Sequence, residues 1–206
     1  MKKILVVEDS KVAQQELRTD LFQLGFKEVE MVSAGEEALK FVQYNQVDLI
    51  IMDIILEGEM SGITAAKKIN IQFDIPIIYL TEGNEDYLDL PGAAVFLAKP
   101  FTKIELKNNI NIVLDKHKIK SDLRENKIFL ENIFNSIQAG LVVLDTNLDI
   151  VRTNPWIDDL YDSYDEIKGK KCYQIFHHRD SPCKECPVIA TLKTGEKHRG
   201  ELKTKD

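Results

Sequence analysis

The chain has 206 residues, of which 44% are hydrophobic and 30% are charged, a composition typical of one large or two small globular domains. Its formal net charge of −7 argues against a nucleic-acid partner. No apolar run approaches the roughly 20 residues that cross a bilayer. The opening MKKILVVEDS turns acidic too early for a signal peptide, so we expect a cytoplasmic protein with no membrane partner.

Short apolar runs alternate with amphipathic stretches as far as about residue 117. This alternation predicts an α/β fold, in which five helices wrap a doubly wound, five-stranded parallel sheet. Ser10 is placed to cap the first helix and Gly25 to end it. We expect the strands at residues 4–7, 29–32, 49–52, 75–80 and 93–98.

Four of these runs close on polar groups. Glu8 and Asp9 follow the first run, Asp53 the third, Thr81 the fourth and Lys99 the fifth. In an open parallel sheet the carboxyl ends of the strands face one side, so these groups should converge. Three neighbouring carboxylates repel one another unless a cation lies among them, and their hard oxygen atoms suit magnesium. The sequence therefore predicts that Asp53 is a magnesium-supported carboxylate.

The stretches LVVEDS, IIMD, IIYLT and LAKPF, in this order, resemble the receiver domain of two-component response regulators, which has a flavodoxin-like fold. The resemblance covers residues 1–117. It implies that Asp53 accepts a phosphoryl group from a histidine kinase or a phosphotransfer protein. It also implies a Mg²⁺ cofactor, bound directly by Asp9 and Asp53, through water by Glu8, and by the backbone carbonyl of Ile55.

The same resemblance implies roles for three more residues. Lys99 would offset charge on the phosphoryl oxygens. The hydroxyl of Thr81 would move to bond a phosphoryl oxygen, and Phe96 would turn inward into the space that Thr81 leaves. A receiver of this kind promotes only its own phosphorylation and dephosphorylation. Whether the chain has any other enzyme activity is left open by the sequence.

Two alternatives compete with a phosphorelay function. Any one of the strand-end residues alone could be a helix cap. The first alternative function is a phosphate-independent scaffold, in which a receiver fold serves only to form dimers. The complete set of strand-end residues weighs against that alternative. A phosphatase with an aspartyl nucleophile would need a second acid two positions after Asp53, where Ile55 stands.

Two departures from the receiver pattern follow the fourth strand. Receivers usually have a small residue after the switch hydroxyl, and here Glu82 follows Thr81. Its carboxylate predicts slow self-phosphorylation from small phosphodonors, because like charges repel. Thr81 and Lys99 are only 18 positions apart, so the segment NEDYLDLPGA leaves little room for the fourth helix.

The fifth helix is predicted to continue as a helical linker over residues 118–127, because IELKNNINIVLDKHKIKSDLRENKIFLENIFNSI has no glycine or proline. Apolar residues at spacings of seven, four and three indicate a coiled-coil seam, with Lys116 and Asn126 at its remaining positions. We expect a homodimer through this linker. The alternative is two helices with a polar turn at residues 120–126. The seam consists of Ile112, Ile119, Leu123, Leu130, Ile133 and Ile137.

The stretch GLVVLDTNLDIVRTNPW reads as two short strands joined by a turn, with Asn154 as a helix cap and Pro155 at the first helical position. With NSIQAGLVVLD, DIVRTNPW and IKGKKCYQIF in this order, residues 128–206 resemble the first two-thirds of a PAS sensor domain, a partial α+β fold. RGELKTKD would start a third strand, so we expect a truncated PAS domain. The whole pattern resembles a receiver–PAS signalling protein or the start of a sensor histidine kinase.

A cysteine-rich stretch, CYQIFHHRDSPCKECP, lies in this second region. Cys183 and Cys186 have the spacing that lets two thiolates bind one metal ion, and Cys172, His177 and His178 could supply further ligands. Zinc, an iron–sulfur cluster, a redox disulfide and ordinary reduced thiols all remain open. A metal or redox sensor with this segment as its input is therefore a further alternative function.

Overall fold

The computed structural model describes residues 2–83, 95–161 and 167–201. The chain divides into two compact units, Met1–Leu123 and Arg124–Asp206. Among the described residues, no helix combines the length and the hydrophobicity that crossing a membrane requires.

The first unit is built on a five-stranded sheet in the order β2-β1-β3-β4-β5, and every neighbouring pair of strands is parallel. This confirms the predicted parallel sheet. Every residue of β3 and β4 is buried, as expected of strands covered on both faces. The strands are β1 Lys3–Val7, β2 Glu28–Val32, β3 Leu49–Asp53, β4 Ile77–Thr81 and β5 Val95–Ala98.

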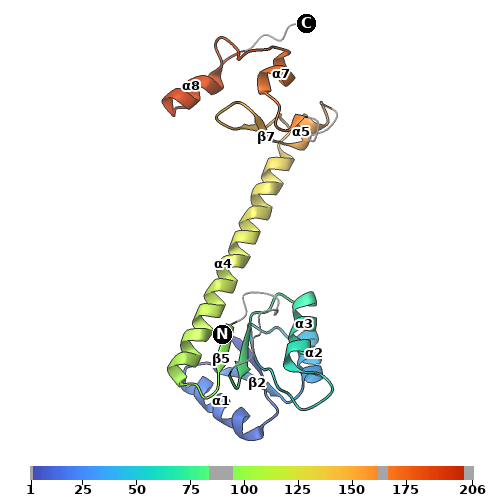
Figure 1. The fold of residues 1–206 in the computed structure, drawn as a ribbon, viewed down its shortest axis with the longest axis vertical. Helices are drawn as coiled ribbons and strands as arrows, with labels where there is room; N and C mark the ends of the chain where they lie inside the picture. The colour runs from blue at the N-terminus through green and yellow to red at the C-terminus, as the bar shows by residue number, and fades with distance from the viewer. Residues whose placement is uncertain (1, 84–94, 162–166, 202–206) are drawn as a thin grey trace. The chain divides into compact units, whose positions relative to one another are not determined.

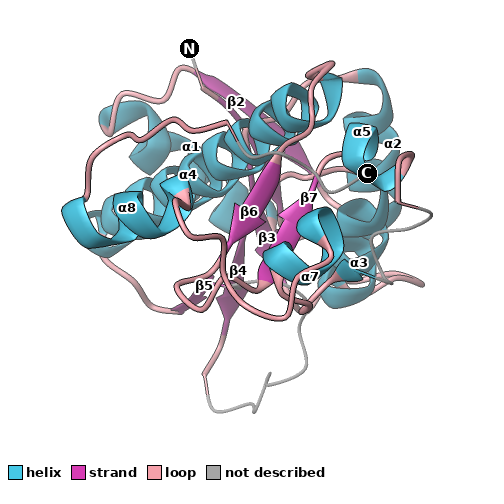
Figure 2. Ribbon diagram, turned by 90° about the horizontal axis from the view of Figure 1, so that it is seen from above, coloured by secondary structure: helices cyan, strands magenta, loops and turns pink. Residues whose placement is uncertain are grey.

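Helices cover both faces of this sheet (Figures 1 and 2). Helix α1, Lys11–Gln23, and the first turns of α4, Lys103–Ser136, pack on one face, where Leu17, Leu21, Leu106 and Ile110 join one hydrophobic cluster. Helices α2, Gly35–Tyr44, and α3, Gly62–Gln72, pack on the other face. The predicted flanking helices are therefore confirmed for the described residues, while the expected short fourth helix falls in residues 84–94, outside them.

Local chemistry explains where the elements begin and end. The hydroxyl of Ser10 accepts a hydrogen bond from the backbone N–H of Ala13 at the start of α1, and Gly25 follows its end with φ of +94°. Strand β4 begins two residues later than predicted, because Pro76 has no N–H to donate to the ladder. It extends to Thr81, whose carbonyl accepts from the N–H of Lys99 at 2.7 Å.

Helix α4 runs without interruption from Lys103 to Ser136, so the alternative of two helices with a turn at 120–126 is wrong. It belongs to the first unit as far as Leu123 and to the second from Arg124.

The second unit contains an antiparallel strand pair, β6 Val142–Leu144 and β7 Ile150–Thr153, as the sequence predicted for these residues (Figure 2). Three short helices follow in the described residues: α5 Pro155–Asp158, α7 Cys172–His177 and α8 Pro187–Thr194. Its buried cluster is small and centres on Ile150, Ile157 and Ile167. Residues 199–201 carry no strand, and 202–206, the rest of the expected third strand, lie outside the described residues.

Asn154 occupies the predicted cap position of α5, but its side chain does not cap the helix. Its Oδ1 accepts from the N–H of Leu141 at 2.9 Å, and its Nδ2 donates to the carbonyls of Ile137 and Ala139. Asn154 is fully buried, so these bonds satisfy an amide that would be costly to bury unpaired. It therefore ties the end of β7 to the segment after α4.

Candidate functional site

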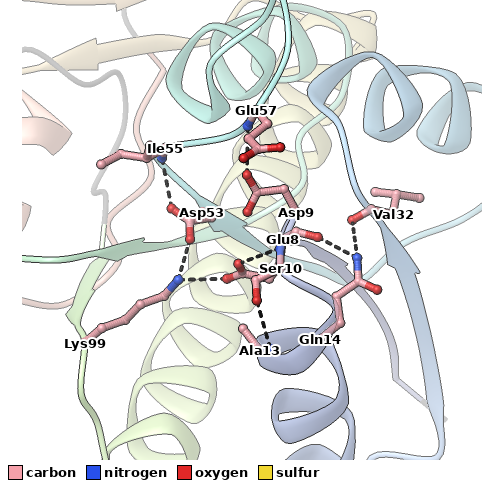
Figure 3. A network of polar contacts seen from close by, with 10 residues as sticks. All are labelled: Glu8, Asp9, Ser10, Ala13, Gln14, Val32, Asp53, Ile55, Glu57 and Lys99. Carbon is pink, nitrogen blue, oxygen red and sulfur yellow. Dashed lines mark hydrogen bonds and ion pairs between the residues drawn. The ribbon is translucent and has the colours of Figure 1, made fainter.

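Four of the five predicted strand-end residues, Glu8, Asp9, Asp53 and Lys99, meet at the carboxyl edge of the first unit's sheet (Figure 3). Parallel register aligns the strand ends: Val7 of β1 pairs with Met52 of β3, and Asp53 pairs with Leu80 of β4. The residue that follows Val7 is Glu8. The sheet thus brings together groups that are far apart in the sequence.

Lys99 lies between two carboxylates. Its Nζ is 2.7 Å from Oε2 of Glu8 and also contacts Oδ2 of Asp53. The residues Glu8 and Asp53 are only 2% and 6% exposed, respectively. Two largely buried acids therefore share one ammonium group, an arrangement that compensates charges in a poorly hydrated place.

Burial is the largest influence on the pKa of Glu8 and raises it above the ordinary value, while the contacts with Lys99 offset only part of that rise. Burial alone would lower the pKa of Lys99, but the hydrogen bonds and charges of Asp53 and Glu8 outweigh it, so its pKa is raised. The lysine is therefore held in its charged form at neutral pH.

The loop after β3 holds the other acid oxygens. The backbone N–H of Ile55 donates to Oδ1 of Asp53 at 2.9 Å, and that of Glu57 donates to Oδ2 of Asp9 at 2.8 Å. Gly62, at the start of α3, lies so close that an added Cβ would be 1.8 Å from the carbonyl oxygen of Asp53. A glycine is therefore required where α3 packs against the end of β3.

Gln14 is a site residue that the sequence reasoning missed. Its Nε2 donates to the backbone carbonyl of Glu8 at 2.5 Å and also lies 3.2 Å from the hydroxyl of Ser33. Gln14 is buried and precedes Leu17 by three residues, so it stands on the apolar face of α1. A polar residue on that face was the signal that could have revealed it.

The two predicted switch residues lie at β4 and β5. The hydroxyl of Thr81 is buried and accepts from the N–H of Gly83 at 3.2 Å. Phe96 is 36% exposed, and its ring stacks on that of Tyr79, with ring centroids 5.5 Å apart. Burial raises the pKa of Tyr79 to about 12. The sequence reasoning did not single out Tyr79, whose phenol ring lies beneath Phe96.

The donor atoms at this edge are of the type that magnesium prefers. Glu8, Asp9 and Asp53 supply three carboxylates against the single ammonium of Lys99, which leaves negative charge in excess (Figure 3). In the described part of the chain, no group of three or more His, Cys, Asp or Glu side chains is arranged so that it could hold a metal ion. The ammonium of Lys99 contacts two of these three acids, Glu8 and Asp53.

The cysteine-rich stretch belongs to the second unit. Cys172 begins α7, and the buried Cys183 and Cys186 precede α8; all three are free thiols. Burial raises the pKa of Cys172, and the neighbouring Cys186 and Cys183 raise it further. Cys183 and Cys186 line a cleft of about 340 Å³, together with residues that include Lys193, His198 and Arg199.

The structure brings together only some of the residues predicted for a second metal or redox site, which are Cys172, His177, Cys183 and Cys186. Cys183 and Cys186 lie close enough to Cys172 to raise the pKa of its thiol. The Nδ1 of His177 is buried and has no hydrogen-bond partner among the described residues. The zinc, cluster and disulfide alternatives stay predictions.

Comparison with known proteins places the first unit in a family. A family model described as the response regulator receiver domain matches residues 4–111, just over half of the chain. The transcriptional regulatory protein YvrH of Bacillus subtilis is 31% identical over 135 residues, which are 64% of this chain and 56% of YvrH. The chain spans about half the length of the curated relatives it matches.

Two solved structures are similar to the first unit. One is the receiver domain of the sensor histidine kinase PA1611 from Pseudomonas aeruginosa PAO1, with a magnesium ion in its active-site cleft. It is 30% identical with a TM-score of 0.51, over 55% of this chain and 98% of that one. The other is the N-terminal domain of a response regulator/sensory box/GGDEF three-domain protein from Carboxydothermus hydrogenoformans. It is 28% identical with a TM-score of 0.54, over 58% of this chain and 99% of that one.

Proposed function

The chain belongs to the response regulator receiver domain family of two-component phosphorelays, and on this premise we propose that Asp53 is its phosphoacceptor. One observation carries the proposal. The carboxylate of Asp53 ends the buried strand β3 and is held between the N–H of Ile55 and the ammonium of Lys99. A histidine kinase or a phosphotransfer protein would be the donor.

The transfer is a displacement at phosphorus. A carboxylate oxygen of Asp53 forms a bond to phosphorus, while the bond from phosphorus to the donor's histidine nitrogen breaks. The electron pair of the broken bond stays on that nitrogen, which then takes a proton. The N–H of Ile55 orients the carboxylate, and Lys99 moves from Glu8 to the phosphoryl oxygens, where its charge offsets theirs.

Asp9 and Asp53 would hold Mg²⁺ directly, Glu8 through water, and Ile55 through its carbonyl. When bound, the ion screens the repulsion between the acidic residues and the incoming phosphoryl group. The oxygen donors at this edge support the assignment, as does the magnesium in the PA1611 receiver domain. Gln14 and Gly62 contribute indirectly, because they position the ends of β1 and β3.

Thr81 and Phe96 would report the new charge. The Thr81 hydroxyl, which now accepts from Gly83, would donate to a phosphoryl oxygen instead. Phe96 would then leave its stacked position on Tyr79 and turn inward. Because α4 begins at Lys103, soon after β5, the change would bias this helix toward one of two arrangements.

The second unit would receive that change as a PAS module. The β6–β7 pair followed by α5 supports this proposal, as does the sensory box named in the Carboxydothermus protein. The division into a receiver at 1–117, a linker at 118–127 and a PAS-like region at 128–206 is part of the proposal. The expectation of no nucleic-acid partner also stays a prediction, since several relatives are named transcriptional regulators.

The test is labelling with radioactive acetyl phosphate and Mg²⁺. Wild type should be labelled, and Asp53→Asn should lose the label. Asp48→Asn is the matched control, because Asp48 precedes β3 and bonds to the N–H of Lys3 at the opposite end of the strand. Unchanged labelling of Asp53→Asn would contradict the assignment.

A further inference from the structure

Helix α4 carries two separate apolar stripes. One stripe, which includes Leu106, Ile110 and Val113, is buried in the core of the first unit. The other is the seam predicted from the sequence. Its residues within α4 are exposed: Ile112 at 47%, Ile119 at 67%, Leu123 at 69%, Leu130 at 63% and Ile133 at 43%, while its last member, Ile137, follows the end of the helix. At about 100° per residue, the seam lies on the opposite side of the helix from the buried stripe.

The seam has the spacing of a two-stranded coiled coil. From Ile119 onward its positions alternate by four and three residues: Leu123, Asn126, Leu130 and Ile133. Such spacing keeps one stripe facing a partner helix along its length. Asn126 is the polar member, and a single polar core residue selects register because it is satisfied only opposite its own counterpart. This favours a partner helix with the same sequence.

The charges beside the seam distinguish the two ways in which identical helices can pair. Asp115 and Asp122 precede seam positions, while Lys120 and Lys127 follow seam positions. In a parallel, in-register pair each such acid faces the base five residues later on the other copy, which matches Asp115 with Lys120 and Asp122 with Lys127. An antiparallel pair would set acid against acid and base against base.

These ion pairs are not available within one helix. Residues five apart lie about 140° apart around a helix, so Asp122 and Lys127 of the same copy point in different directions. Lys120 lies 3.9 Å from Asp74, but both side chains are largely exposed and the pair is weak. Asp122 with Lys127 is therefore the cleaner pair to examine.

We propose that the seam of α4 binds the same segment of a second copy of this chain as a parallel, in-register coiled coil, with Asp122 of each copy facing Lys127 of the other. The two copies' receiver units would then lie beside the same length of paired helix. This inference does not depend on phosphoryl transfer to Asp53.

The first test compares two substitutions on one helix. Leu130→Asp places a charge in the seam, whereas Ile128→Asp places it on the opposite side, where Ile128 is similarly exposed at 51%. Sedimentation velocity of the full chain over a range of concentrations should show dimers for wild type and Ile128→Asp, and monomers for Leu130→Asp. Monomeric wild type at every concentration, or equal effects of the two substitutions, would overturn the proposal. Circular dichroism checks that both variants keep their helix.

The second test addresses direction. Asp122→Lys should weaken the dimer roughly five- to tenfold, since two facing pairs change from attraction to repulsion. Adding Lys127→Asp should restore it. An antiparallel pair already faces like charges, so an unchanged dissociation constant for Asp122→Lys would overturn the parallel arrangement. Both tests use no phosphodonor, and their failure would leave the assignment of Asp53 untouched.

Discussion

The two units differ in the size of the hydrophobic core that supports their candidate functional residues. In the first unit, two clusters of 13 buried residues each cover the two faces of one sheet. Among the described residues of the second, the buried cluster has three members. The acids around Asp53 lie at the ends of buried strands, while Cys183 and Cys186 lie in a loop before a short helix. A site on strand ends is held in place by the packing beneath it.

The largest expected effect on stability comes from creating a cavity in the core of the first unit. Ile78→Ala should cost about 2–5 kcal/mol of unfolding free energy, because Ile78 is fully buried in β4. Ile71→Ala is the control, since Ile71 is 82% exposed on α3 and should change stability little.

Trp156, the chain's single tryptophan, makes the measurement specific to a unit. Its fluorescence reports urea unfolding of the second unit, while circular dichroism reports both. If the cores are separate, Ile78→Ala moves the dichroism transition and leaves the fluorescence transition in place. A common shift of both would show that the units unfold together.

A smaller change sharpens the link between core and site. Gly62→Ala should cost about 1–3 kcal/mol, because its Cβ would collide with the carbonyl of Asp53. It should also slow labelling of Asp53 by acetyl phosphate, since relieving the clash displaces the carboxylate. Ser61→Ala is the control: it removes the cap that accepts from Thr64 and should lower stability without affecting the labelling rate. Equal rates in both variants would separate the site from this packing contact.

The pH dependence of stability distinguishes two acids at opposite ends of neighbouring strands, Glu8 after β1 and Asp48 before β3. Burial raises the pKa of Glu8 above the ordinary 4.5, so the folded chain binds this proton more tightly than the unfolded chain. The stability gained from the protonated Glu8 carboxyl is fully present below the ordinary pKa of 4.5, and it is lost as pH rises through the pKa of the folded state. Glu8→Gln should therefore gain stability relative to wild type as pH rises from 4 toward neutrality, measured by urea midpoints.

Asp48 provides the opposite sign in the same experiment. Burial opposes the shift, but hydrogen bonds from the Lys3 N–H and the Lys2 ammonium lower its pKa below the ordinary 3.8. Its contribution is present above that value and is lost as pH falls through the folded pKa. Asp48→Asn should therefore lose stability at neutral pH and approach wild type in acid. Parallel curves for the two variants would refute the assigned shifts.

The smallest expected effect concerns Glu82, which is exposed beside the site. Glu82→Ala should raise the rate of phosphorylation by acetyl phosphate about two- to fivefold, because one repelling charge near the anionic donor is removed. The rate should become less sensitive to salt as well. Equal rates for wild type and Glu82→Ala would show that this carboxylate does not influence donor access.

The apolar runs, and the turn-forming and helix-capping residues between them, were enough to predict the parallel sheet, the polar strand ends and the strand pair of the second unit. Burial on both faces forces β3 to be continuously apolar, so Asp53 stands out at its end. Periodicity could not foresee Tyr79 beneath Phe96, nor that the amide of Asn154 would join β7 to the segment after α4 instead of capping α5.

By itself, the sequence determined which chemical groups stand at the strand ends, because alternation and residue type are local properties of the chain. Only the tertiary structure decided which of them touch. The sharing of Lys99 between Glu8 and Asp53, the support of Glu8 by Gln14 and the close approach of Gly62 all join residues from different elements. Such contacts depend on strand register and helix packing, which arise from the burial of the whole core rather than from any one segment.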